Sequence, residues 1–406
     1  MSQPVTLAAW LTEPGGKIIA VNRGLPSQDV AALVYQLAPE PKMLVTDQPD
    51  VYAGQLPVQT SVSLPALLTV EPSLKQGTLI IDIKLTALPA ALLNQFQSTV
   101  LMLPYGFTQQ ELAQLQQVFP APFMIYGLEP RMLDFFWQQQ VTPMSATQAK
   151  VYELALAQSL VTPGPTGYQA IQEASNFIYP TFSPELGGTP PDLLEDEGGW
   201  ISLQTMRDLK EQSPKFYQLT RFMATEAKQA LVSPSKGIAA QAPGQLGGKY
   251  VIVTRFFQKY GLLLLRALLL LYNDIDSHLL PYDLTAEQVT TTLTEFNQAP
   301  TGVLIMNLVQ LPFAPQGVTD IIIVEGMEVQ VLDYLVQTIV SNANYQRPTD
   351  ITMHLLASKA PDSISSVDLE LFQPFELLEQ ERKVAFTNFT KQAGQLRFNG
   401  TDFVIV

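Results

Sequence analysis

The pattern of apolar and polar residues predicts two successive regions in which strands and helices alternate. In the first region, short continuous apolar stretches predict buried strands at residues 17–21, 42–47, 77–83 and 98–106. Apolar residues at helical spacing predict helices at 27–37 and 107–119. Ser27 is the expected N-cap of the first helix, and Thr108 with Glu111 forms a capping box for the second.

The alternation restarts near residue 249 and continues to the tail. Apolar runs predict strands at 249–256, 301–308, 318–326 and 349–357. Helical patterns lie between them, at 260–272, 286–299 and 329–340. The tail predicts a helix at 376–390 and a hairpin at 396–406 that turns at Asn399 and Gly400.

This order of elements predicts an α/β protein. Parallel strands need crossover connections, and helices between successive strands supply them. We therefore expect two doubly wound parallel-sheet lobes joined by an irregular, partly helical segment that is rich in Pro and Gly. The expected boundaries are 1–140 for the first lobe, 141–245 for the linker or insertion, 246–362 for the second lobe, and 363–406 for a C-terminal helix and hairpin.

The amino-acid composition and net charge make some classes of function unexpected. The chain has 406 residues, 47% hydrophobic and 15% charged, with a formal net charge of −14, so it is a globular protein with an acidic surface. Autonomous nucleic-acid binding is not expected, because affinity for phosphates rests on Lys and Arg. Three basic residues, Arg255, Lys259 and Arg266, could contact phosphate. A nucleic-acid binding module without ATPase activity is therefore kept as an alternative function.

Metal and membrane chemistry find little support. The chain has no cysteine, and its only histidines are His278 and His354, so neither a zinc site nor a Ser-His-Asp triad is expected. His354 lies in an apolar strand and is expected to be a core or sheet-face residue. No signal peptide is expected, and the apolar stretch 261–272 is too short to span a bilayer and carries Arg266. We expect it to be a buried helix, with a partner-binding helix as the alternative.

The motifs of the second region resemble a known family. Thr254-Arg255-Phe256 closes a strand, Phe296-Asn297 closes a helix, and the stretches 303–307, 317–325 and 337–344 follow in order. Upstream, the stretches that match are 141–152, 167–180 and 213–223. In this order they resemble the superfamily 2 helicase-like proteins of large DNA viruses, of the kind of the poxvirus nucleoside triphosphate phosphohydrolase I and early transcription factor small subunit. The resemblance implies two RecA-like lobes.

The residues that hold ATP in such enzymes are replaced in the first lobe. A P-loop needs Gly-x-x-x-x-Gly-Lys followed by Ser or Thr, whereas the loop before Ser27 has one Gly and no Lys. Lys17 lies at the start of the strand, ahead of the loop, and is followed by Ile18, so it is misplaced for phosphate. The acidic box should end in Asp-Glu, yet Asp82 is followed by Ile83 and Lys84.

Two further motifs of these enzymes are also altered in this chain. The Ser/Thr-Ala-Thr motif is replaced by Leu103-Pro104-Tyr105. The Gln-x-x-Gly-Arg-x-x-Arg motif keeps Gln337 but has Ser341 and Asn344 at its later positions, so the arginine finger is missing unless Arg347 substitutes.

These departures favour a catalytically inactive helicase-like protein. We expect no cofactor and no catalytic residues, and a scaffold role in a virion or in a viral transcription assembly. Its expected partners are other viral proteins, capsid proteins or RNA polymerase subunits, in the virion or the host-cell cytoplasm. The alternative is a nucleic-acid-dependent ATPase with a divergent site.

Overall fold

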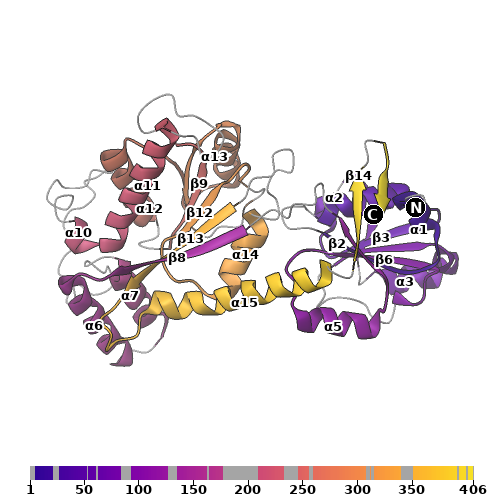
Figure 1. Cartoon of the computed structure of the whole chain (residues 1–406), viewed down its shortest axis with the longest axis horizontal. Coiled ribbons are helices and arrows are strands. Elements are labelled where there is room, and N and C mark those ends of the chain that lie inside the picture. Colours follow the sequence, from indigo (N-terminus) through magenta and orange to yellow (C-terminus); the bar gives the residue numbers. More distant parts are fainter. Residues whose placement is uncertain are drawn as a thin grey trace. The chain divides into compact units, whose positions relative to one another are not determined.

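In the computed structural model the chain forms two compact units (Figure 1). Unit 1 comprises Met1–Leu133 and Glu376–Val406, and unit 2 comprises Asp134–Phe375. The structure describes residues 5–21, 27–52, 54–60, 63–83, 93–126, 135–161, 164–176, 209–232, 246–255, 259–307, 311, 315–339, 351–390, 393–398 and 401–405.

Unit 1 is built on a parallel sheet with a doubly wound, RecA-like strand order. Its central strands are β7 (Phe123–Tyr126), β2 (Gly15–Val21), β6 (Ser98–Leu103), β5 (Thr78–Asp82) and β3 (Lys42–Thr46), adjacent in that order and followed by the short β4 (Val58–Gln59). The chain leaves β2 in one direction, returns through β5 and β6, and crosses to β7 on the other side. The carboxyl end of β2 is therefore a topological switch point, where α/β sheets place their ligands.

Alternating side chains of these strands enter two cores. Ile18 and Ile81 face one core, which also receives Phe386. Ile19 and Ile80 face the other, which is covered by α2 (Ser27–Leu37) and α1 (Leu7–Thr12). Both sheet faces are buried, which explains why the strands are continuous apolar runs.

Two further helices in the described part of unit 1 lie between its strands. They are α3 (Leu64–Val70) and α5 (Gln109–Val118), with short 3-10 turns at Pro49–Tyr52 and Pro72–Gln76. The predicted capping box is confirmed, since Thr108 and Glu111 bond each other's backbone N–H at the start of α5.

Unit 2 is a second parallel sheet with helices on both faces. Its order is β10 (His278–Leu280), β11 (Gly302–Met306), β9 (Lys249–Val253), β12 (Asp320–Ile323), β13 (Ile351–Lys359) and β8 (Phe135–Pro143), and every neighbouring pair is parallel. Its switch point lies between β9 and β12.

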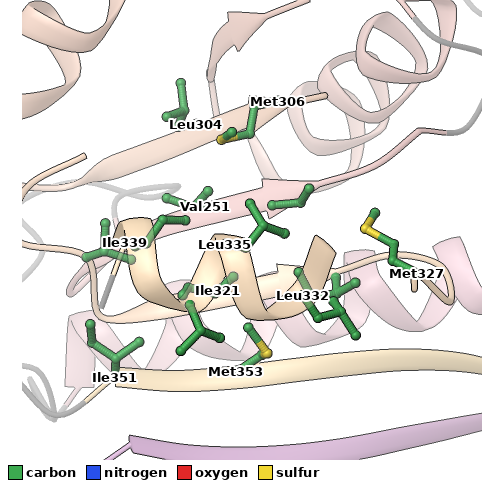
Figure 2. Close-up of a cluster of buried hydrophobic side chains, with 14 of the residues drawn as sticks. Val251, Leu304, Met306, Ile321, Met327, Leu332, Leu335, Ile339, Ile351 and Met353 are labelled. Carbon is green, nitrogen blue, oxygen red and sulfur yellow. The ribbon is translucent and has the colours of Figure 1, made fainter. Parts of the chain in front are cut away.

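Two apolar cores flank this sheet. Figure 2 shows the first, in which Leu335 and Ile339 of α14 (Val329–Ile339) lie over strand residues such as Val251 and Ile321. α13 (Ala286–Gln298) belongs to the same core through Leu293. The fold class is thus confirmed as two doubly wound α/β lobes.

The helix predicted from the most apolar stretch of the chain packs on the opposite face of this sheet. α12 (Lys259–Asn273) buries Leu262, Leu265 and Leu269 against the sheet together with α11 (Pro214–Val232), so the expectation of a buried helix is confirmed. Within the described residues, no helix combines the length and apolar character needed to cross a bilayer.

The two units do not follow the four segments expected from the sequence. The described residues between 141 and 245 do not stand apart: β8 pairs along its whole length with β13, and α6 (Ala146–Val161), α7 (Pro165–Asn176) and α10 (Leu209–Gln212) are part of unit 2. Sequence patterns missed this because β8 reads as a mixed polar stretch and its partner lies over 200 residues away.

The tail also differs from its predicted form. α15 begins at Val367, nine residues before the predicted start, and contains Pro374. The predicted hairpin is confirmed as β14 (Gly394–Phe398) and β15 (Phe403–Ile405), although Asn399 and Gly400 lie outside the described residues. The hairpin is not a separate element: β14 pairs with β7 and β15 with β1 (Val5–Thr6), so the tail extends the first sheet.

Candidate functional site

The strand ends of unit 1 bring Ser27, Tyr52 and Asp82 together. Ser27 opens α2 directly after the loop that follows β2, and Asp82 closes β5 on the same edge of the sheet. The Tyr52 hydroxyl donates to Asp82 Oδ2 at 2.5 Å, and the Ser27 side chain also hydrogen-bonds the Asp82 carboxyl. Two of the residues expected at degenerate ATP-binding positions, Ser27 and Asp82, are therefore neighbours.

Burial controls the chemistry of this group. Desolvation raises the pKa of Asp82, and the nearby Asp47 raises it further, whereas the hydrogen bonds from Tyr52 and Ser27 oppose the increase. Tyr52 is itself buried, and its pKa is raised mainly by burial and then by the Asp82 charge. A carboxyl group that holds Mg²⁺ must be ionised and open to the metal. The Asp82 carboxyl is instead shielded and partnered by a phenol.

The other first-lobe positions give no phosphate site. Lys17 lies in the amino-terminal half of β2 and is buried; its ammonium donates to Ser98 Oγ at 3.1 Å and to the carbonyl of Glu13. Leu103 closes β6 as a buried core residue. Lys84, Ser341, Asn344 and Arg347 lie outside the described residues; so does the side chain of Gln337, whose backbone belongs to α14.

The strand ends of unit 2 hold a buried ion pair. Lys215, at the start of α11, donates to Asp368 Oδ2 at 2.7 Å, and the two side chains are 1% and 0% exposed. The same ammonium donates to Asn176 Oδ1 at 2.8 Å and to the carbonyl of Val324 at 2.9 Å. These bonds use all three N–H donors of Lys215.

Asp368 is the centre of the network. Its carboxylate accepts from the backbone N–H groups of Gly326 at 2.8 Å and Ser358 at 2.9 Å, besides Lys215. Gly326 has no room for a side chain, since a Cβ there would lie 2.8 Å from the Cα of Asp368. The network thereby fastens the ends of β12 and β13 to the first turn of α15.

This arrangement unites motifs that are distant in the sequence. Asn176 belongs to the upstream stretch 167–180, Lys215 to 213–223, and Val324 to 317–325, all of which carried the family resemblance. Asp368 was not singled out from the sequence, because it lies in the tail among other acidic residues and only the tertiary structure gives it a partner.

A buried carboxyl stands at the switch point itself. Glu325, directly after β12, accepts from Thr254 Oγ1 at 2.9 Å and from the backbone N–H of Arg255, both directly after β9. Burial raises the pKa of Glu325 to about 7, against the lowering effect of these hydrogen bonds and of Lys215. This carboxyl therefore titrates near neutral pH.

A cavity of about 520 Å³ opens over these strand ends. One wall is α7, and the other contains the residues that follow β9, β10, β11 and β12. The lining residues are Pro165, Tyr168, Gln169, Gln172, Glu173, Asn176, Arg255, Tyr282, Asn307, Glu325 and Glu328. Arg255 pairs with Glu328 at 3.0 Å, and both side chains are well exposed.

The remaining basic and histidine residues that the sequence singled out lie in unit 2. Arg266 pairs with Asp276 on the surface at 3.0 Å, and the Lys259 side chain lies outside the described residues. His354 is buried and pairs with Asp320 at 3.0 Å, which confirms it as a core residue. His278 lies 3.9 Å from Glu295. In the described part of the chain, no group of three His, Cys, Asp or Glu could hold a metal.

Comparison with known proteins gives matches among solved structures alone. No protein-family model and no curated protein matches the chain. The helicase domain of Hef from Pyrococcus furiosus is 10% identical, with 91% of this chain and 96% of that chain covered and a TM-score of 0.48. The SWI2/SNF2 ATPase core from Sulfolobus solfataricus, in complex with dsDNA, is 9% identical over 95% and 87%, with a TM-score of 0.39.

Proposed function

We propose that this chain is a helicase-like protein that does not hydrolyse ATP and acts as a structural subunit of a viral assembly, either the virion or the transcription apparatus. Two lines support the helicase-like part. The motif stretches occur in the family's order along the sequence, and three of them converge on one buried network in unit 2.

The contact between Tyr52 and Asp82 carries the proposal that hydrolysis is lost. In phosphoryl transfer the protein must hold Mg²⁺ with an ionised carboxylate and stabilise the transition-state charge. Asp82 is the acidic residue in that place, and its Oδ2 accepts a hydrogen bond of 2.5 Å from a buried phenol. Its raised pKa further disfavours the charged form that a metal requires.

The alternative function, a divergent ATPase, is favoured by one observation. Ser27 and Asp82 are the residues expected to bind Mg²⁺ in a P-loop enzyme, and their side chains interact directly. A rearranged Tyr52 would leave a hydroxyl and a carboxylate beside the start of α2, where helix N–H groups attract anions.

An assay of ATP turnover separates the two functions. The intact chain, with and without single- or double-stranded nucleic acid, is expected to show no turnover, and Asp82→Asn is expected to change nothing. Asp276→Asn, which alters an exposed carboxylate paired with Arg266, is the matched control. Turnover that Asp82→Asn abolishes and Asp276→Asn spares would establish the ATPase instead.

The structural role is tested by cross-linking mass spectrometry on native particles and on infected-cell extract. Cross-links to capsid proteins support a virion subunit, and cross-links to RNA polymerase subunits support the transcription apparatus. A chain that cross-links to no viral protein in either sample would contradict the proposal.

A further inference from the structure

We propose that the cavity of unit 2 binds the guanidinium or ammonium group of a basic segment on a partner protein. The proposal deepens the proposed structural role, because it names the chemistry of the partner. It does not depend on whether unit 1 hydrolyses ATP.

The geometry is that of a ligand site. The cavity lies at the carboxyl ends of a doubly wound parallel sheet, next to its switch point, and its volume of about 520 Å³ falls within the usual range for ligand pockets. The lining face of α7 carries Tyr168, Gln172 and Asn176, which are spaced four residues apart and so lie on one side of the helix.

The charged side chains that line the cavity favour a positively charged ligand. Among the described lining residues, the carboxyl groups are those of Glu173, Glu325 and Glu328, and the one basic side chain is that of Arg255. Arg255 already pairs with Glu328 at 3.0 Å. An incoming guanidinium would take over a carboxylate whose present ion pair is well exposed and therefore contributes little stability.

The nearby lysine does not offset this balance. Lys215 lies beneath the cavity, but its three N–H donors are used by Asp368, Asn176 and the carbonyl of Val324, and its side chain is 1% exposed. A phosphate entering the cavity would meet carboxyl groups with no accessible cation besides Arg255 among the described lining residues.

Two tyrosines complete a site for a delocalised cation. Tyr168 and Tyr282 line the same cavity, and Tyr282 is exposed at 56%. Guanidinium and ammonium groups are attracted to the faces of such rings. A bound cation would also favour the ionised form of Glu325, whose pKa of about 7 means that it can release its proton at neutral pH.

Two substitutions distinguish a cation site from a phosphate site by the sign of their effect. Arg255→Gln frees Glu328 and is expected to strengthen cation binding several-fold. Glu328→Gln removes the carboxylate and is expected to weaken it about tenfold. A phosphate site would respond in the opposite sense, because Arg255→Gln removes a guanidinium that would bind the phosphate.

The probe is the peptide acetyl-Gly-Arg-Arg-Gly-amide, titrated into the full chain by isothermal calorimetry at low salt. Its counterpart with citrulline, which is neutral and nearly the same shape, is expected to bind at least tenfold more weakly. Glu295→Gln, an exposed glutamate beside His278 outside the cavity, is the matched control and should leave the affinity unchanged.

Other outcomes would overturn the inference. Equal affinity for the arginine and citrulline peptides would exclude a charge-selective site. Binding of a single-stranded oligonucleotide that Arg255→Gln abolishes would assign the cavity to nucleic acid. Thermal unfolding of each variant checks that the fold persists, and the ATP turnover assay reports separately on unit 1.

Discussion

The two units have the same architecture, but they differ in the residues at the carboxyl ends of their sheets. In unit 1 this edge is filled by Ser27, Tyr52 and Asp82, which form a small group in which the carboxyl is shielded and its charged form disfavoured. In unit 2 the corresponding edge holds a buried ion pair, a carboxyl that titrates near pH 7 and a cavity of about 520 Å³.

A doubly wound sheet therefore supplies a place for a ligand without fixing the ligand's chemistry. The fold brings strand ends together at a switch point, and the residues at those ends decide whether the place is filled or hollow and which charge it accepts. We expect unit 2 to bind and unit 1 to be inert, and substitutions in each unit test this contrast.

The largest effect is expected for Lys215→Met in unit 2. The substitution leaves the buried Asp368 carboxylate without its partner, which should destabilise unit 2 by about 3–5 kcal/mol. Hydrogen exchange of peptides from β12 and β13 measures the loss locally. Lys359→Met, which removes an exposed partner of Asp362, is the control and should cost less than about 1 kcal/mol. Unchanged protection of β12 would contradict the role given to the network.

The next effect concerns the pH dependence of unit 2. Because the pKa of Glu325 is raised when folded, its protonated form favours the fold, and this stability is lost as the pH rises from the ordinary 4.5 to about 7. At about 1.4 kcal/mol per pH unit, the loss is about 3 kcal/mol.

Glu325→Gln does not titrate and isolates this contribution. Urea unfolding between pH 4 and 8 should show wild-type stability falling relative to the variant across that window, with a plateau above it. Glu295→Gln is the control, since its side chain is 62% exposed. Parallel curves for wild type and Glu325→Gln would show that the Glu325 carboxyl does not titrate differently in the folded state.

In unit 1, Tyr52→Phe should have a moderate effect. Loss of the hydroxyl leaves the half-buried Asp82 carboxyl with one donor fewer, at a cost of about 1–3 kcal/mol, and raises the pKa of Asp82 further. Hydrogen exchange of peptides from β5 measures this loss of stability. Tyr35→Phe, whose ring packs over the Lys42 ammonium at 5.0 Å, keeps its packing and should change β5 little. If Tyr52→Phe created ATP turnover, the contrast between the units would fail.

The smallest effect is expected for Arg266→Gln on α12. Arg266 pairs with Asp276 on the surface, with side chains 44% and 72% exposed, so stability should change by less than about 1 kcal/mol. Nucleic-acid binding should not change either, as measured by fluorescence anisotropy with a labelled oligonucleotide. A salt-sensitive loss of binding would restore Arg266 as a phosphate contact.

Most local elements could be predicted from their own residues. Helical spacing predicted α2 with its observed bounds, although Ser27, the expected N-cap, is the first residue of the helix and its side chain bonds Asp82. Thr108 with Glu111 predicted the capping box of α5. The continuous apolar runs predicted the central strands, because residues buried on both faces of a parallel sheet cannot alternate with polar ones. Each of these signals lies within a few residues of the element that it specifies.

The pairings between distant residues depend instead on the folded sheets. Asp368 meets Lys215 across 153 residues and Asp82 meets Tyr52 across 30. β14 joins β7 in the first sheet, although its hairpin partner is the adjacent β15. Carboxylates, lysines and edge strands have many possible partners along a chain, and their own sequence neighbourhood does not rank them. The folded sheets select among these partners by bringing strand ends together, which is why the elements could be predicted and the cavity could not.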